Sequence, residues 1–573
     1  MNSVNPAADA IHGAQEVPGP AESHEGTKSL RGGSQAQQLI ELAEGAALFR
    51  APDSTAYADI ILNGHRETVA LRGRPFRQWL ARAFYKATGA AVGSEPLQNA
   101  LNVLEAKAHF EAEERSVHVR VAECEGRLYL DLGDDTWQAV EIDQTGWRLV
   151  VDPPVRFRRP AGLRPLPRPE RGHRIDVLRR FLNVGSDRDF VLTVAWLVAC
   201  LRNHGPYPVL VLTGEQGSAK STCSAILRSL IDPNAAGLRA LPRDERDLFI
   251  AANNGHVLAF DNVSGLPGSV SDTLCRLATG ASFAVRQLYS DQDETLFTAA
   301  RPAILNGIDD IVSRPDLADR ALFLTLAPIA EESRRPESEL WAAFEMEKPK
   351  LLGALLDAAV VGLRRLPEVR LGRLPRMADF ALWATACETA HWPAGTFMAA
   401  YDDNRADTVE NVIDSDPVAA GVKALCANQS NWSGTATDLL DALCQTVGER
   451  IAKSKTWPAD ARALSGRLKR AATFLRKIGI EVAFSREGHG RKRVVRLASS
   501  PSAAAATPGA DDADDADADR AYFREERAAI LQYDAGLSRQ QAEQIAATEF
   551  SEMPGTDRTS LEQLTASTDG ISQ

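Results

Sequence analysis

The stretch that most constrains the fold is PVLVLTGEQGSAKST, residues 208–222. Its apolar run VLVL (209–212) is typical of a buried strand, and the KSTCSAILRSL that follows the loop is typical of a helix. Gly214 and Gly217 supply the turn between them. Short apolar strands alternate with helices over 175–330, which is the pattern of a parallel α/β sheet. The sequence therefore predicts such a sheet, with a glycine-rich loop after one strand.

A loop of this kind can bind phosphate groups. It needs successive backbone N–H groups, small residues, a lysine for the β- and γ-phosphates and a hydroxyl for Mg²⁺. Lys220 and Ser221 lie in the first helical turn, where the positive end of the helix dipole faces the phosphates. We therefore predict that ATP and Mg²⁺ are cofactors. The predicted nucleotide-binding residues are Gly214, Glu215, Gln216, Gly217, Ser218, Ala219, Lys220, Ser221 and Thr222.

One residue of the loop departs from the usual pattern, since Ala219 stands where glycine is expected. Alanine tolerates right-handed helical backbone and adds only a methyl group. We therefore expect the loop to form with a negative φ at this position.

Two further strand ends carry polar residues. HVLAFDN (256–262) ends a strand in Asp261, expected to hold Mg²⁺ through water, and in Asn262, which can orient a water but cannot accept its proton. RPAILNGIDDI ends another in Asn306, suited to sensing the γ-phosphate. The general base is left open among Glu215, Asp309 and Asp310.

The segment SRPDLADRALFLTL contains two arginines, Arg314 and Arg320. An arginine that bridges subunits can stabilise charge on a neighbour's γ-phosphate. The alternative is a surface salt bridge to Asp316 or Asp319, which competes more strongly for Arg314 than for Arg320.

Composition bounds the class of protein. A chain of 573 residues should form three or four units, and 44% hydrophobic with 25% charged residues is typical of soluble globular proteins. Seven scattered cysteines without a CxxC pair indicate buried thiols rather than a zinc site. The start of the chain does not resemble a signal peptide, and the longest apolar run, 190–201, predicts a buried helix. We expect a cytoplasmic protein.

Changes of pattern suggest the domain boundaries. Residues 38–110 have helical spacing and 116–150 alternate as strands. The six prolines and seven arginines of 151–174 predict a stiff linker, with a basic strap along nucleic acid as the alternative. The predicted organisation is a disordered N-terminus (1–37), an α+β domain (38–150), the linker (151–174), an α/β core (175–330), a helical subdomain (331–412), a winged helix (413–500), an acidic spacer (501–519), a helical docking segment (520–550) and a disordered tail (551–573).

Two regions are candidates for DNA contact. The β-rich runs 282–289 and 294–300 predict a hairpin that could present Arg286 and Tyr289 to a single strand, or could be purely structural. Ten basic residues lie within 467–496 of a chain whose net charge is −12, which is an electrostatic footprint for DNA or a solvated basic face. The predicted contacts in this region are Arg467, Lys469, Arg470, Arg476, Arg491, Lys492 and Arg493.

The strings YPVLVLTGEQGSAKST, FDNVSGL, SDTLCRLATG and RPAILNGI make residues 175–330 resemble the superfamily 3 helicases, a branch of the AAA+ ATPases. They are similar above all to replication ATPases of phages and mobile elements. The resemblance implies a P-loop ATPase core, a homo-oligomeric ring that is expected to be a hexamer, and DNA unwinding driven by ATP hydrolysis. It implies Lys220 and Ser221 at the phosphates, Asp261 at Mg²⁺, Asn306 as sensor and Arg320 supplied by the neighbouring subunit.

Two alternatives to a helicase stay open at this point. One is an ATP-dependent initiator or loader that remodels DNA without processive unwinding, and the other is a DNA-binding scaffold in which Asn262 marks lost catalysis. The C-terminal helical segment resembles a docking peptide for a primase or polymerase.

Overall fold

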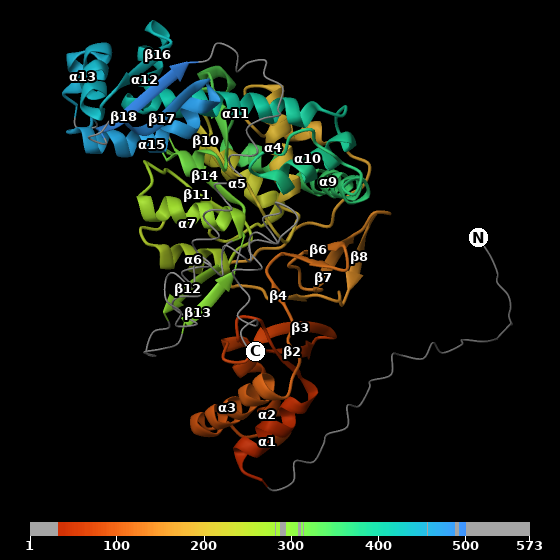
Figure 1. The fold of residues 1–573 in the computed structure, drawn as a ribbon. Coiled ribbons are helices and arrows are strands. Elements are labelled where there is room, and N and C mark those ends of the chain that lie inside the picture. Colours follow the sequence, from red (N-terminus) through yellow and green to blue (C-terminus); the bar gives the residue numbers. More distant parts are fainter. Residues whose placement is uncertain are drawn as a thin grey trace, which may run out of the picture. The chain divides into compact units, whose positions relative to one another are not determined.

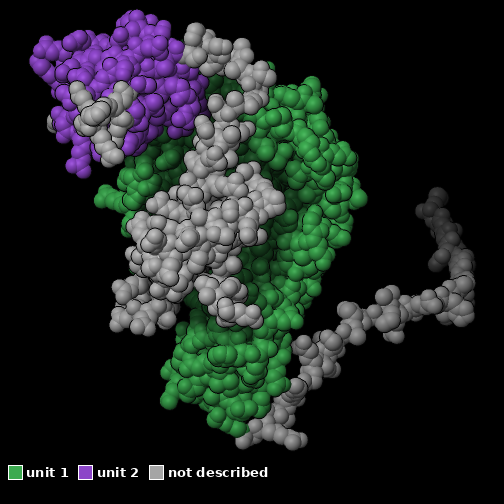
Figure 2. All heavy atoms as spheres, viewed as in Figure 1, with its two compact units in different colours: residues 1–420 green, residues 421–573 purple. Residues whose placement is uncertain are grey.

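The computed structural model describes residues 33–280, 282–286, 294–298, 300–307, 311–312, 314–454, 457–487 and 492–499. The chain divides into two compact units, 1–420 and 421–573, which Figure 2 shows in different colours. The predictions for the N-terminus before residue 33, the acidic spacer, the docking segment and the tail lie outside the described residues.

The first unit begins with a small α+β domain (Figure 1). Three strands form an antiparallel sheet in the order β1-β2-β3, and the helices pack on it around Phe76, Leu80 and Leu104. The helical interpretation of 38–110 is therefore wrong over the strands. Asn63 and Gly64, with φ of 52° and 81°, form the tight turn of the β2–β3 hairpin. The elements are α1 (Gln35–Leu42), η1 (Ala43–Gly45), β1 (Ala47–Arg50), β2 (Ala56–Leu62), β3 (His65–Ala70), α2 (Arg74–Thr88) and α3 (Ser94–Phe110).

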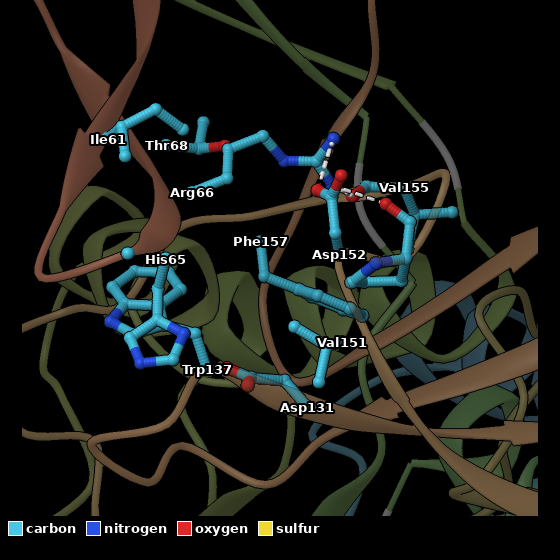
Figure 3. Close-up of a pocket in the computed structure, with 12 residues that line it drawn as sticks. Ile61, His65, Arg66, Thr68, Asp131, Trp137, Val151, Asp152, Val155 and Phe157 are labelled. Atoms are coloured by element: carbon cyan, nitrogen blue, oxygen red, sulfur yellow. Dashed lines mark hydrogen bonds and ion pairs between the residues drawn. The ribbon is translucent and has the colours of Figure 1, made fainter. Parts of the chain in front are cut away.

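A block of strands follows, as the alternating pattern of 116–150 predicts. Four strands form an antiparallel meander in the order β5-β6-β7-β8, and two short strands pair in parallel beside it. Arg66 of β3 contacts Asp152 at 2.8 Å and donates to the carbonyl of Val155 at 3.2 Å, beside a small cavity of about 130 Å³ (Figure 3). The elements are β4 (Val117–His118), β5 (Val121–Cys124), β6 (Arg127–Asp131), β7 (Gln138–Ile142), β8 (Trp147–Val151) and β9 (Arg156–Phe157).

The proline- and arginine-rich segment 151–174 is extended, as predicted, but it is packed against the rest of the unit. Leu166 is buried, and the N–H of Glu170 donates to the carbonyl of Pro349. Six of the seven arginines have partners within the chain: Arg156 with Asp59, Arg158 with Asn253, Arg159 with Asp131, Arg168 with Gln138, Arg171 with Trp147 and Arg174 with Asp176. Asp59, Asp131 and Asp176 neutralise Arg156, Arg159 and Arg174, so these three arginines are not available to a nucleic-acid strap.

The centre of the first unit is a parallel four-stranded sheet, as predicted. Its order is β11-β14-β10-β15, and its strands are buried in the main hydrophobic core together with α4 and α5. The apolar run 190–201 becomes the buried helix α4. The elements are η2 (Ile175–Arg180), α4 (Asp187–Ala199), β10 (Val209–Gly214), α5 (Lys220–Ile231), α6 (Glu245–Asn253), β11 (Leu258–Phe260), α7 (Gly268–Thr279), β12 (Ser282–Arg286), β13 (Glu294–Thr298), β14 (Ala303–Asn306), α8 (Pro315–Ala318) and β15 (Ala321–Leu326).

The residues that follow β15 in the sequence form helices that pack on this core, which agrees with the helical prediction for 331–412. Phe344, Trp383 and Phe397 join the same hydrophobic cluster as α4. The elements are η3 (Glu331–Ser333), α9 (Glu337–Arg365), α10 (Ala378–Cys387), η4 (Glu388–Ala390) and α11 (Thr396–Ser415).

The second unit contains helices and one three-stranded antiparallel sheet of order β16-β18-β17. The helices of this unit bury a set of apolar side chains: Leu439, Leu443, Leu464, Leu468 and Phe474. The short strand β16, which pairs with β18, was not predicted from the sequence. The elements are α12 (Pro417–Asn428), which crosses the boundary, β16 (Asn431–Gly434), α13 (Ala436–Val447), α14 (Glu449–Ala452), α15 (Ala461–Lys477), β17 (Ile480–Glu487) and β18 (Lys492–Ser499). Within the described residues, none of the helices has the length and apolarity needed to cross a membrane.

Candidate nucleotide site

The predicted phosphate loop joins the end of β10 to the start of α5. Gly214 has a φ of 144°, and a Cβ at this position would clash with the carbonyl oxygen of Leu326. Lys220 Nζ donates to the carbonyl oxygens of Gly214 and Glu215, both at 2.7 Å, and Ser218 Oγ donates to the Glu215 carbonyl at 2.8 Å. The lysine therefore already lies over the loop whose amides would face a phosphate.

Ala219 adopts a left-handed conformation, with φ 60° and ψ 32°, at the N-cap of α5. The expectation of a negative φ at this residue is wrong. The reason is the turn itself, because the chain must reverse between Gly217, with φ 85°, and the first helical residue. A glycine would adopt this conformation freely, whereas for alanine it costs roughly 1–2 kcal/mol.

Ser221 and Asp261, the two predicted metal ligands, come together although 40 residues separate them. Ser221 Oγ donates to Asp261 Oδ1 at 2.7 Å. Oxygen ligands of this kind suit Mg²⁺, which usually binds one or two carboxylates, several waters and the phosphates of its nucleotide. These residues therefore fit a Mg²⁺–nucleotide complex. In the part of the chain that the structure describes, no group of three or more His, Cys, Asp or Glu side chains is placed to hold a metal ion.

Asn306 is buried, and its side chain links two other elements of the site. Its Oδ1 accepts the backbone N–H of Asn262 at 3.2 Å, and its Nδ2 donates to Ser224 Oγ on α5 at 2.8 Å. Asn262 also has a left-handed backbone, with φ 55°, which asparagine tolerates better than most residues. Asn306 thus holds the end of β11 against the phosphate-loop helix, and this is a positioning contact.

The two candidate arginines have different surroundings. Arg314 pairs with Asp272 at 2.9 Å and donates to the carbonyl of Gly268 at 2.8 Å. Arg320 Nη1 donates to the carbonyl of Asp316 at 2.8 Å. Among the described residues no carboxylate forms an ion pair with Arg320, so its positive charge is not neutralised within the unit.

Two contacts to the loop were not predicted from the sequence. Asn183 Nδ2 donates to the carbonyls of Ser218, at 3.0 Å, and Ala327, at 2.6 Å. It therefore connects the phosphate loop to the residue that follows β15. Arg334 Nη2 lies 3.5 Å from the point where a Cβ on Gly217 would stand. Neither residue lies in a recognisable motif, so only the fold reveals them.

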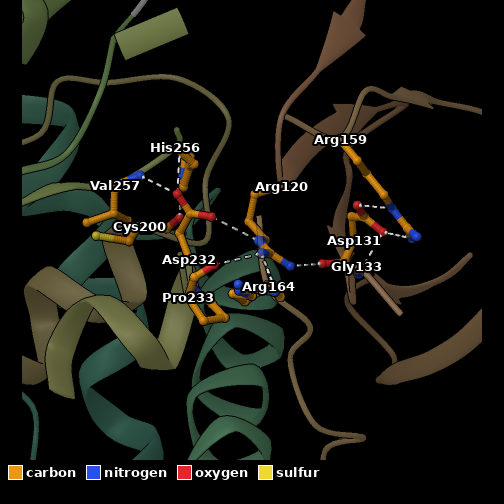
Figure 4. A network of polar contacts seen from close by, with 10 residues as sticks. All are labelled: Arg120, Asp131, Gly133, Arg159, Arg164, Cys200, Asp232, Pro233, His256 and Val257. Carbon is orange, nitrogen blue, oxygen red and sulfur yellow. Dashed lines mark hydrogen bonds and ion pairs between the residues drawn. The ribbon is translucent and has the colours of Figure 1, made fainter. Parts of the chain in front are cut away.

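A buried network lies at the other end of α5 (Figure 4). Asp232, the C-cap of the helix, pairs with Arg120 of the strand block at 3.1 Å, and both side chains are almost fully buried. Asp232 Oδ2 also accepts the backbone N–H groups of His256 and Val257. Burial alone would raise the pKa of Asp232, but Arg120 and its other neighbours outweigh burial and hold that pKa below its ordinary value.

Most of the predicted DNA-contact residues lie within the described part of the chain. β12 and β13 pair as an antiparallel hairpin with Arg286 opposite Glu294, while Tyr289 and Arg491 lie outside the described residues. Lys469, Arg470, Arg476 and Arg493 are exposed, Arg467 is half-buried, and Lys492 begins β18. Arg476 lies 3.5 Å from Glu481, and Lys469 lies over the ring of Phe484. The basic cluster of the second unit is thus largely on its surface.

Comparison with known proteins identifies the chain. Two descriptions of one family match it: "Actinomycete integrative conjugative element replication protein" over residues 175–408, and the C-terminal domain of such a RepA protein over 418–511. Together they cover more than half of the sequence. The chain belongs to this family of mobile-element replication proteins. The predicted role in mobile-element replication is confirmed, and assignment to the superfamily 3 helicases stays a prediction.

Other comparisons add little. No curated protein matches the chain. Two apo structures of the C-terminal region of NrS-1 are similar over 81% and 82% of this chain and 98% and 100% of their own. Their sequence identities are 11% and 10%, and both TM-scores are 0.38.

Proposed function

We propose that this replication protein is an ATP-dependent DNA helicase or translocase. The observation that carries the proposal is the meeting of Ser221 and Asp261 beside Lys220, at the start of a helix that follows a glycine loop. The strand order supports it, since β14 lies between β10 and β11 and brings Asn306 to the same edge as Asp261. These are the parts that an ATP-hydrolysing AAA+ core requires.

Each residue has a role in this proposal. Lys220 neutralises phosphate charge, and Ser221 with Asp261 would hold Mg²⁺, which when bound supplies charge stabilisation for phosphoryl transfer. Asn262 orients the attacking water, and Asn306 fixes the backbone from which Asn262 projects. Arg320, which has no ion pair among the described residues, acts on the nucleotide of a neighbouring subunit in a hexameric ring.

DNA is the proposed substrate track. The order α12-β16-α13-α14-α15-β17-β18 in the second unit supports the proposal of a winged helix, with α15 as its recognition helix. Exposed Lys469, Arg470 and Arg476 on or beside α15 would contact the duplex backbone. The hairpin β12–β13 would grip one strand. We further propose a primase or polymerase as partner, bound by the C-terminal segment.

The main alternative is an ATP-dependent initiator or loader, which the family match supports equally well because it names replication without naming unwinding. A non-hydrolysing scaffold is the second alternative. It is favoured by Asn262, which occupies the place of a carboxylate and cannot act as a base.

The deciding experiment is steady-state ATP hydrolysis by the purified full-length protein, alone and with single-stranded or duplex DNA. Stimulation by single strands supports a helicase, stimulation by duplex alone supports the initiator, and no turnover at all supports the scaffold. Lys220→Ala should abolish hydrolysis, while Lys86→Ala, on an exposed helix face of the N-terminal domain, should not. Unchanged hydrolysis in Lys220→Ala would refute the assignment of the site.

A further inference from the structure

A groove of about 590 Å³ lies in the first unit, apart from the phosphate loop. Its walls come from the loop at Asp53, the β4 segment with His118, the extended segment at Arg158, and the turn at His204. The groove is also lined by residues on either side of the β12–β13 hairpin in the sequence, namely Thr279, Gly280, Ala300 and Arg301. The groove therefore begins where the hairpin leaves the core.

The groove concentrates positive charge. Arg301 donates through Nε to the carbonyl of Ala252 at 2.9 Å and through Nη1 to the carbonyl of Ala300 at 3.0 Å. Arg158 donates through Nη2 to the main chain and side chain of Asn253. These partners are uncharged, and among the described residues neither arginine has a carboxylate in an ion pair. Asp53 is the single acidic residue among the described residues that line the groove.

Both guanidinium groups are thus oriented by neutral partners and retain their charge for a ligand. Burial lowers the pKa of Arg301 and the nearby positive charge of Arg158 lowers it further, while Tyr207 and Asp232 partly oppose this shift. Burial also lowers the pKa of His118, so its imidazole is neutral at pH 7 and can serve as a hydrogen-bonding group. Two fixed guanidiniums with amide and imidazole groups around them match the chemistry of phosphodiester recognition.

We propose that this groove binds the phosphodiester backbone of a single DNA strand next to the β12–β13 hairpin. The choice of DNA rests on the proposed function, and the phosphate chemistry rests on the groove itself. A recessed groove of this volume admits one strand, whereas a duplex would expose its phosphates on a wide cylinder that cannot enter. Its volume also falls within the ~300–1,000 Å³ of small-molecule sites, so a free nucleotide is the other source of the same chemistry.

The test measures binding of a fluorescent oligo-dT of about 20 nucleotides, longer than the ~16-nucleotide upper site size of single-strand domains. The full-length protein is used without ATP. Arg158→Gln keeps a donor for Asn253 but removes the charge, and it should weaken binding about five- to tenfold and reduce the dependence of affinity on salt by about 0.7 in logarithmic slope. Arg174→Gln, a change of the same kind at an exposed arginine of the same segment that does not line the groove, should bind like the wild type.

Asp53→Asn is a second variant, and its expected effect is tighter binding, which a misfolded protein would not show. It keeps the acceptor for the N–H of Thr55 but removes the negative charge from the groove, so it should tighten oligo-dT binding about two- to threefold. Unchanged affinity in both groove variants would overturn the proposal. Binding of ATP to Lys220→Ala that disappears when Arg158→Gln is added would assign the groove to a free nucleotide instead. Failure of the helicase proposal would appear separately, as hydrolysis unaffected by Lys220→Ala.

Discussion

Two residues of the candidate site have left-handed backbone although neither is glycine, namely Ala219 and Asn262. The sequence reveals that both depart from the usual motif, but it does not reveal their dihedral angles. These are decided by the path of the loop between elements that meet only in the folded chain. The strand, the loop and the helix could be predicted because they are local, and the sign of φ could not.

Ala219→Gly should stabilise the first unit by about 1 kcal/mol, because glycine adopts φ 60° without steric cost. The measurement is urea unfolding of the full-length protein. Ala225→Gly, which makes the same change inside α5, should destabilise the unit by about 1 kcal/mol. Loss of stability in both variants would mean that Ala219 is not strained.

Asn306→Ala should lower both stability and nucleotide affinity. It removes the acceptor of the Asn262 N–H and the donor to the buried Ser224 Oγ, and a lost hydrogen bond of this kind costs about 0.5–1.5 kcal/mol. Urea unfolding and titration with a fluorescent ATP analogue test this together. Normal stability with impaired hydrolysis alone would instead favour a direct γ-phosphate sensor.

This link was invisible in the sequence for a physical reason. The partners of Asn306 stand 44 and 82 residues away, and nothing in either local pattern indicates that they meet.

At the scale of elements, the buried pair of Arg120 and Asp232 connects α5 to the strand block. His256 belongs to this network, and its ring Nε2 donates to the Cys200 carbonyl at 2.6 Å. Burial lowers the pKa of His256 to about 4, against 6.5 in an exposed chain. Between pH 6.5 and about 4, His256 is therefore protonated in the unfolded chain and neutral in the folded protein.

Stability of the first unit should accordingly fall as the pH drops from 6.5 towards 4, by up to roughly 3 kcal/mol. Below about pH 4 both states are protonated and this contribution stops changing. Unfolding in urea at several pH values measures it. His256→Gln should flatten the profile over this window, and His173→Gln, at an exposed position, should leave it as in the wild type.

Elements were predicted well where one period dominates, as in β5–β8 and α9–α11. The β2–β3 hairpin was missed because the helical spacing of its neighbours was extended across it, although Asn63-Gly64 is a strong hairpin signal. Packing of the 151–174 segment could not be predicted either, since proline and arginine content alone does not distinguish a free linker from one whose arginines find partners in the fold.

At the scale of the whole molecule, the arrangement of subunits is the main open prediction. Arg320→Ala should abolish ATP hydrolysis while nucleotide affinity stays near the wild-type value, because the proposed function places this arginine against a neighbouring subunit's nucleotide. Mixing Arg320→Ala with Lys220→Ala protein should restore part of the hydrolysis, since some interfaces then combine an intact loop with an intact arginine.

Arg314→Ala is the matched control, because Arg314 is engaged with Asp272 of its own chain. It should keep its turnover. If the mixture of Arg320→Ala and Lys220→Ala stays inactive, Arg320 does not act across an interface.

The sequence was most informative about the nucleotide site, whose motifs are short, and least informative about surfaces made by distant segments, such as the groove beside the hairpin. That groove joins parts from residue 51 to residue 301, so no window of sequence contains it.

The position of Asp232 has a mechanical consequence. The helix α5 begins at the phosphate loop with Lys220 and is capped 12 residues later by Asp232, which is fixed to Arg120 of the strand block. A helix of this length is a stiff rod of about 18 Å. If the proposed ATP hydrolysis displaces the loop along the helix axis, α5 would transmit that displacement to the strand block through the Asp232–Arg120 pair.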